Sequence, residues 1–172
     1  ITEAAGNGTT TVAESGAIIE HLVATHGPAW RPAPGTPAHQ RYVYWMHFAE
    51  GSAMPPLVMK LIFNRIKTAK MPFFAKPIAN GIADKVLGGF VQPNIDRQLD
   101  YMNSELKGRE WFCGDAITAA DVQMSFPLEA AASRGGLNKA RHGALATWLD
   151  RIHARPAYQR AEAKGGPAIP SF

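Results

Sequence analysis

The sequence has a single cysteine, few charged residues and no long apolar run. Cys113 is the only cysteine among the 172 residues, which excludes a disulfide within the chain and fits a reducing compartment. No stretch approaches the roughly 20 consecutive apolar residues that a membrane-spanning helix needs. The first residues carry neither the basic head nor the apolar segment of a signal peptide. These absences favour a cytoplasmic protein with no membrane partner.

Metal-ligand spacing and nucleic-acid motifs are missing as well. The six histidines never pair with a cysteine or a carboxylate at ligand spacing, so we expect no metal. The net charge is +4, and the densest basic stretch spans residues 60–76 without an acidic residue. Such a stretch is typical of a solvated helix face or an anion-tolerant surface. Because no nucleic-acid-binding motif accompanies it, we expect no nucleic-acid partner.

The first 27 residues have the pattern strand, turn, strand, helix. Two short β-prone pieces, 1–3 and 9–12, flank a turn at Asn7-Gly8, which predicts a β-hairpin. Apolar residues at helical spacing follow Ser15, and Gly27-Pro28 ends that helix.

Residues 28–37 contain four prolines and indicate an extended linker. Every long segment after the linker has helical periodicity. The first helix must kink or stop at Pro55-Pro56 because proline lacks a backbone N–H. The sequence therefore predicts a mainly α fold, with a small α/β part at 1–27, the linker at 28–37 and an all-helical domain at 38–172. We expect the later helices at about 73–106 (bent at Gly88-Gly89 and Pro93), 119–134, 143–154 and 157–163.

Glu14-Ser15 lies where the second strand meets the first helix. We expect Ser15 to be the N-cap, beside free N–H groups and the positive end of the helix dipole. Such a helix end binds carboxylates, and the adjacent Glu14 could pair with an ammonium group. The pair suits an α-amino acid head group; an ordinary cap beside an exposed glutamate is the alternative.

Two further segments carry information. Thr118 and Asp121, three positions apart, have the spacing of a capping box, which is a folding device. In the helix from Tyr42 to Met54, Trp45 is expected in the core. Four residues share another, mixed face that could line a site or contact a second subunit: His47, Glu50, Gly51 and Met54.

Together these residues resemble the glutathione S-transferase family, with a likeness to its bacterial members that spans residues 1 to about 163. Residues 11–22, Thr-Val-Ala-Glu-Ser-Gly-Ala-Ile-Ile-Glu-His-Leu, look like the end of the family's thioredoxin-like domain. Residues 112–121 look like the lead-in and capping box of its all-helical C-terminal domain, and 148–158 follow its C-terminal pattern. The resemblance implies that Glu14 binds the amine and Ser15 the carboxylate of the γ-glutamyl group of glutathione.

The resemblance also implies a cytoplasmic homodimeric detoxification enzyme that transfers the glutathione thiolate to hydrophobic electrophiles, with glutathione as substrate and no metal. The Tyr, Ser or Cys that activates the thiol is expected upstream of Ile1, so the chain by itself is not expected to activate the thiol. Cys113, in the lead-in to a distant helix, is expected to be structural. Two alternatives stay open: a non-catalytic module for protein association, and a thiol-transfer or peroxidase-type enzyme that uses a catalytic cysteine.

Overall fold

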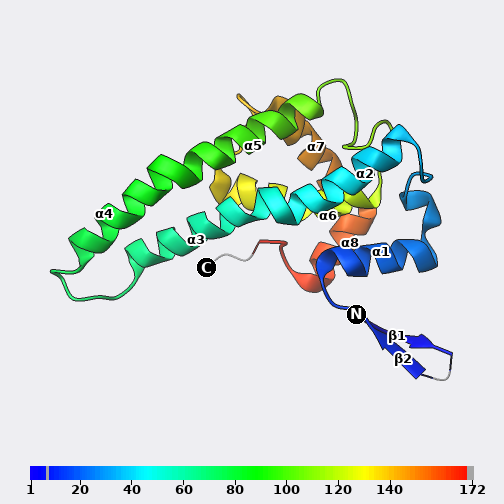
Figure 1. The fold of residues 1–172 in the computed structure, drawn as a ribbon, viewed down its shortest axis with the longest axis horizontal. Coiled ribbons are helices and arrows are strands. Elements are labelled where there is room, and N and C mark those ends of the chain that lie inside the picture. Colours follow the sequence, from blue (N-terminus) through cyan, green and yellow to red (C-terminus); the bar gives the residue numbers. More distant parts are fainter. Residues whose placement is uncertain (7, 170–172) are drawn as a thin grey trace.

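The computed structural model describes residues 1–6 and 8–169, and most of them are helical. The chain begins with an antiparallel hairpin of β1 (Thr2–Ala5) and β2 (Gly8–Thr11), in which Thr2 lies opposite Thr11. The hairpin projects from the helical body (Figure 1). A two-stranded hairpin precedes the helices as the sequence predicts, but β1 ends two residues later than expected and β2 begins at Gly8, which was expected in the turn. The expected turn residue Asn7 lies outside the described residues.

The helix α1 (Ser15–His26) and the linker follow the hairpin. A short 3₁₀ turn, η1 (Pro28–Trp30), leads into an extended segment, and α2 begins at Pro37, one residue before the expected start. Thr36 caps α2 because its hydroxyl accepts a hydrogen bond from the His39 N–H at 3.1 Å. Proline is compatible with the first helical position because the N–H there has no intrahelical partner.

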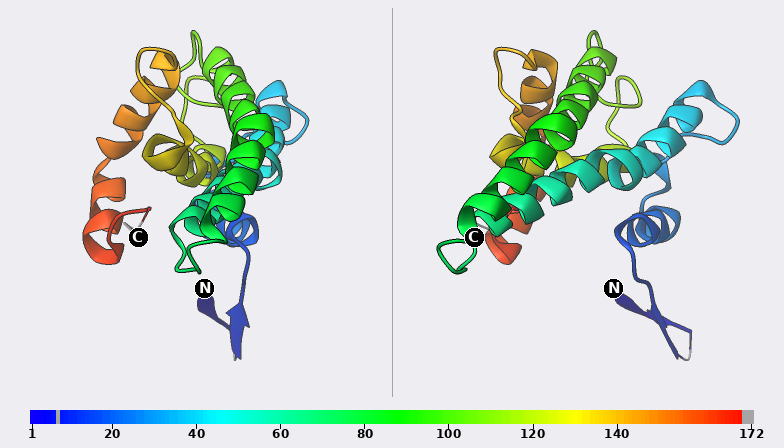
Figure 2. Two further views of the ribbon diagram at one scale, coloured as in Figure 1. Left: turned by 90° about the vertical axis from the view of Figure 1, so that its left-hand side faces the viewer. Right: turned by 60° about the vertical axis from the view of Figure 1, so that its left-hand side comes forward.

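Two long helical segments run side by side in opposite directions (Figures 1 and 2). The first is α2 (Pro37–Phe48), η2 (Ala49–Ala53) and α3 (Met54–Thr68), and the second is α4 (Lys76–Val86), η3 (Leu87–Val91) and α5 (Gln92–Glu105). The first helix was expected to kink or stop at Pro55-Pro56. Instead, the helical segment continues through a π-helical turn, η2, directly before α3. There Met54 N–H bonds to the Ala49 carbonyl, so both prolines fall in the first turn of α3.

The helix α6 (Ala119–Ala130) lies at the centre of the core. It continues into η4 (Ala131–Gly135), and α7 (Gly143–His153) and α8 (Pro156–Gly165) follow. Trp45 is fully buried, with its ring centroid 4.5 Å from that of Phe112, which in turn lies 5.2 Å from that of Trp148. These rings join α2 and α7 through the segment that leads into α6.

Thr118 and Asp121 form a capping box at the start of α6. The Asp121 side chain is 0% exposed and accepts hydrogen bonds from the Thr118 N–H at 2.9 Å, the Phe112 N–H at 3.0 Å and the Trp148 indole N–H at 3.1 Å. A single carboxylate therefore satisfies donors from three segments of the chain, which makes it a structural centre of the helical domain.

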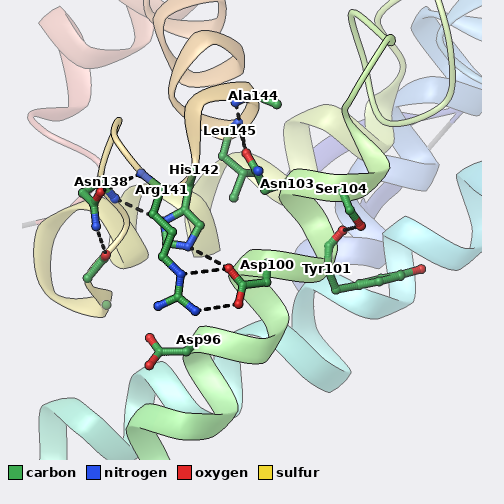
Figure 3. A network of polar contacts seen from close by, with 12 residues as sticks. Asp96, Asp100, Tyr101, Asn103, Ser104, Asn138, Arg141, His142, Ala144 and Leu145 are labelled. Atoms are coloured by element: carbon green, nitrogen blue, oxygen red, sulfur yellow. Dashed lines mark hydrogen bonds and ion pairs between the residues drawn. The ribbon is translucent and has the colours of Figure 1, made fainter.

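A second polar network joins α5 to the loop before α7 (Figure 3). Arg141 donates to both carboxylate oxygens of Asp100, at 3.0 and 2.6 Å, and the buried His142 ring lies 3.4 Å from the same carboxylate. The Asn103 side-chain oxygen accepts hydrogen bonds from Ala144 N–H at 3.0 Å and Leu145 N–H at 3.2 Å. The N-terminus of α7 is thus capped by a residue of another helix.

Candidate functional site

The candidate site begins at the junction of the hairpin and α1. Glu14 has φ 71° and ψ 128°, and no other residue besides glycine has a positive φ in the described part of the chain. Because Glu14 is not helical while its carbonyl accepts the first helix bond from Ile18 N–H at 2.9 Å, Glu14 is the N-cap. The expectation that Ser15 is the N-cap is therefore wrong: Ser15 is the first residue of α1.

The backbone at this junction is strained. A positive φ at a residue with a side chain costs of order 1 kcal/mol or more, and such strain is concentrated at functional sites. The strained turn presents the first turn of α1, with the N–H groups of Ser15, Gly16 and Ala17, which have no partner within the helix. Those N–H groups and the helix dipole favour a carboxylate.

Ser15 is joined to two residues of the helical domain. Its hydroxyl donates a hydrogen bond to Glu50 Oε1 at 3.1 Å. The side-chain amide of Gln123 donates to both of them, to Ser15 Oγ at 3.1 Å and to Glu50 Oε1 at 2.9 Å. Ser15 and Glu50 are exposed, whereas Gln123 is 3% exposed. The three side chains form a cluster in which a buried amide holds an exposed hydroxyl and an exposed carboxylate in place.

The four residues expected to share one face of the first long helix are divided by the structure. Glu50 accepts a hydrogen bond from Ser15 of its own chain, whereas the sequence left open whether it lines a site or contacts a second subunit. His47 is exposed on α2, Gly51 is exposed in η2, and Met54 is partly buried against the core. The π-helical turn η2 lies directly before Met54, and because such a turn contains more residues than an α-helical turn, it rotates Met54 out of the expected register.

A cavity of about 440 Å³ lies beside the cluster, between α1 and α2. Gly16, Ala17 and His47 are among the residues that line it. At its other end Glu20 accepts a hydrogen bond from the Tyr42 hydroxyl at 2.6 Å and pairs with Arg31 at 3.1 Å. These two contacts tie α1 to the linker and α2, and so fix the direction in which the N-terminus of α1 points.

Two other candidate groups lie elsewhere. Cys113 is 8% exposed, and burial raises the pKa of its thiol to about 11, so the thiol is protonated and unreactive at neutral pH. Asp121 is bound to the core donors described above. Within residues 1–6 and 8–169 no group of three His, Cys, Asp or Glu side chains could hold a metal ion.

Sequence reasoning missed Gln123, although one signal was available. The capping box fixes where α6 starts, and the residues three or four positions from Gln123 on the same helix, Ala120 and Pro127, are apolar, as expected of a buried face. A lone amide on an otherwise apolar face has to find a polar partner, because an unsatisfied buried amide is costly. The identity of that partner could not be inferred from spacing.

Comparison with known proteins assigns the fold to a family. The family model of the glutathione S-transferase C-terminal domain matches residues 66–156, more than half of the chain. The chain belongs to the glutathione S-transferase family. The matched region holds the end of α3, the whole of the second antiparallel segment (α4, η3 and α5), the capping box, α6 and α7. The family resemblance predicted from the sequence and the expected fold class are thereby confirmed.

Curated relatives and a solved structure agree. Glutathione S-transferase 3 of Schizosaccharomyces pombe is 32% identical over 90% of this chain and 63% of its own length. Glutathione S-transferase 1 of Saccharomyces cerevisiae is 29% identical over 70% of this chain and 52% of its own length. A glutathione transferase of Phanerochaete chrysosporium in complex with oxidized glutathione has the same fold, with a TM-score of 0.71 and 23% identity over 95% of this chain and 70% of its own. The chain thus spans less than two thirds of the length of both curated relatives.

Proposed function

We propose that this chain forms part of a glutathione S-transferase that binds glutathione at the N-terminus of α1 and conjugates its thiolate to hydrophobic electrophiles. The family and a relative solved with oxidized glutathione support the choice of ligand. The cluster of Ser15, Glu50 and Gln123 carries the proposal, because it places a hydroxyl, a carboxylate and a helix N-terminus together. Glutathione is the substrate, and no metal takes part.

The γ-glutamyl end of glutathione carries both a carboxylate and an ammonium group. The free N–H groups of α1 and the Ser15 hydroxyl suit the carboxylate, and the Glu14 and Glu50 carboxylates suit the ammonium group. The Ser15 hydroxyl now donates to Glu50. When the ligand carboxylate is bound, the hydroxyl can turn to it, while Gln123 continues to donate to Ser15 Oγ and fixes its position.

Thiol activation falls to a residue of the thioredoxin-like domain that we expect upstream of Ile1. Catalysis of this kind depends on a hydrogen bond and a positive field that lower the thiol pKa. Cys113 cannot take that role, since it is buried and has a raised pKa. Within this chain the proposal therefore assigns binding residues and leaves the activating group to the preceding part of the domain.

The assembly and location of the protein are also proposals. We propose a cytoplasmic, two-fold homodimer that acts in detoxification, of bacterial type, with a thioredoxin-like part at 1–27, a linker at 28–37 and a helical domain at 38–172. His47 is exposed and available to a partner subunit, whereas Glu50 already binds Ser15 within the chain. We therefore assign His47, and no longer Glu50, to a subunit contact.

A calorimetric titration with glutathione tests the binding site. The measurement uses the longest natural form of the protein that carries this chain, and compares Ser15→Ala with Ser104→Ala. Ser104 is a suitable control because it is exposed and its hydroxyl donates to the Tyr101 carbonyl, far from α1. Loss of a charge-assisted hydrogen bond should weaken binding by about tenfold or more in Ser15→Ala only.

Two outcomes would count against the proposal. Equal glutathione affinity of a folded Ser15→Ala variant and the parent would show that the Ser15 hydroxyl does not bind glutathione. No detectable glutathione binding by the parent would favour the alternative of a non-catalytic module for protein association.

A further inference from the structure

The turn between α3 and α4 has an unusual composition. Ala75 N–H donates to the Pro72 carbonyl at 3.0 Å, which places Phe73 and Phe74 at the two central positions of a turn. Small and polar residues usually occupy these positions. The Phe73 side chain is 88% exposed and that of Phe74 is 67% exposed, and the two rings meet edge to face with centroids 5.7 Å apart. A hydrogen-bonded turn therefore holds two aromatic rings in solvent.

The turn lies at the end of the long helical pair, far from α1 and the hairpin (Figures 1 and 2). We call it the α3–α4 tip and define it as residues 69–78. Ile78, in the first turn of α4, is 66% exposed and extends the apolar surface. The tip projects from the body, so its apolar groups are not the floor of a groove.

Positive charge is concentrated around the same tip. Residues 60–90 contain six Lys or Arg and one Asp, a net charge of +5. The whole chain has a net charge of +4, so all other residues together carry a net charge of −1. Lys70 and Lys76 flank the aromatic turn, are exposed, and form no ion pair with any residue that the structure describes. The exposed apolar groups of the tip thus lie in a region of positive electrostatic potential.

We propose that the α3–α4 tip docks on an anionic lipid bilayer, with Phe73 and Phe74 in the interface and Lys70 and Lys76 at the headgroups. Exposed apolar aromatic residues beside basic residues are a combination that holds proteins at anionic membrane surfaces. A second copy of the tip fits poorly, because two tips that each carry Lys70 and Lys76 and no acidic residue repel each other. A flat bilayer also accommodates a convex tip without a matching groove.

This contact differs from a membrane span. In the described part of the chain no helix is long and apolar enough to cross a membrane. The expectation of no membrane partner was drawn from the lack of long apolar runs, and an interfacial contact needs no such run. The inference is independent of the proposed glutathione site, which lies at the other end of the helical pair.

Vesicle flotation tests the proposal. The full chain is mixed with vesicles of phosphatidylcholine alone, or of equimolar phosphatidylcholine and phosphatidylglycerol, at low and high salt. We expect binding to the phosphatidylglycerol vesicles, weakened by salt. The double variants Phe73→Ala/Phe74→Ala and Lys70→Gln/Lys76→Gln should each lower partitioning by about tenfold or more.

Two control variants match these changes outside the tip. Phe126→Ala removes another exposed phenylalanine, on α6, and Lys139→Gln removes another exposed lysine. Both should bind vesicles as the unchanged chain does. The tip side chains are exposed, so circular dichroism should show unchanged folding for all variants.

Three results would overturn the proposal. One is equal binding to both vesicle types or to neither. Another is unchanged partitioning of both tip variants. The third is a changed sedimentation coefficient for Phe73→Ala/Phe74→Ala without a change in vesicle binding, which would make the tip a contact between copies of the chain.

Discussion

Gln123 donates a hydrogen bond to Ser15 at 3.1 Å, although 108 positions of sequence separate the two residues. The contact joins the first turn of α1 to the central helix of the all-helical domain. Because the same amide donates to Glu50 at 2.9 Å, it positions both polar groups of the proposed glutathione site. In the proposed site, the helical domain therefore contributes residues that contact Ser15 directly.

The first prediction concerns Gln123→Ala. The variant leaves Ser15 Oγ and Glu50 without their shared donor, so glutathione affinity should fall by about fivefold to tenfold. Stability should fall by about 1–2 kcal/mol because the two domains lose a partly buried contact. Calorimetric titration and urea denaturation measure the two effects. Gln159→Ala is the control, since that exposed amide donates to the His153 carbonyl. Unchanged glutathione affinity in Gln123→Ala would show that the Gln123 amide does not position Ser15 and Glu50 for binding.

The second prediction concerns Asp121→Ala. Removal of the carboxylate leaves buried N–H donors of Phe112, Thr118 and Trp148 without a partner. Each unsatisfied buried donor costs about 1–3 kcal/mol, so a total loss of at least about 3 kcal/mol is expected. Glutathione affinity of the folded protein should not change. Denaturation and titration on one sample check both statements, with the exposed Asp115→Ala as control. Normal stability with lost binding would make Asp121 a site residue.

The third prediction concerns pH. Burial raises the pKa of Asp121 above its ordinary value of 3.8, although four hydrogen bonds to the carboxylate oppose the shift. A group with a raised folded pKa takes up a proton on folding. Its contribution to stability is therefore present below the unfolded pKa and is lost as pH rises through the folded pKa.

Urea denaturation of the unchanged chain and of Asp121→Asn at increasing pH measures this effect. The stability of the unchanged chain relative to Asp121→Asn should decrease as pH rises above about 4. A relative stability that increases with pH would mean that the hydrogen bonds outweigh burial and that the folded pKa is depressed.

The fourth prediction concerns Cys113. A pKa of about 11 in place of 9.0 lowers the thiolate fraction at neutral pH about 100-fold, and the side chain is 8% exposed. A water-soluble disulfide reagent should label the native chain at least about 100 times more slowly than the urea-unfolded chain. Cys113→Ser supplies the blank. Rapid labelling of the native protein would show an accessible thiol and reopen a cysteine-based mechanism.

Local patterns in the sequence were sufficient to predict much of the fold. The hairpin, α1 and the long helices follow from alternation, helical spacing and turn residues within short windows. The Thr118–Asp121 capping box has a fixed spacing of three residues and could be recognised directly. Such features depend on near neighbours in the chain, and sequence reasoning places them within a few residues.

Other features depend on effects that no short window contains. The π-helical turn η2 changes the helical register by a fraction of a turn. Met54 therefore does not lie on the helix face that it was expected to share with Glu50. The positive φ of Glu14 was not predictable because glutamate rarely adopts it, and strain of this kind is maintained by the surrounding structure. The contacts among Ser15, Glu50 and Gln123 join residues 35 to 108 positions apart.

The most direct test of the glutathione site uses backbone amide signals in a nuclear magnetic resonance titration. The N–H groups of Ser15, Gly16 and Ala17 begin α1 without helical partners. Ala144 and Leu145 begin α7 with N–H groups that Asn103 already caps, which makes them an internal control. On addition of glutathione, the signals of residues 15–17 should shift in a saturable manner while those of 144–145 stay in place. Saturable shifts that leave residues 15–17 unaffected would contradict the assignment of the glutathione site to the N-terminus of α1.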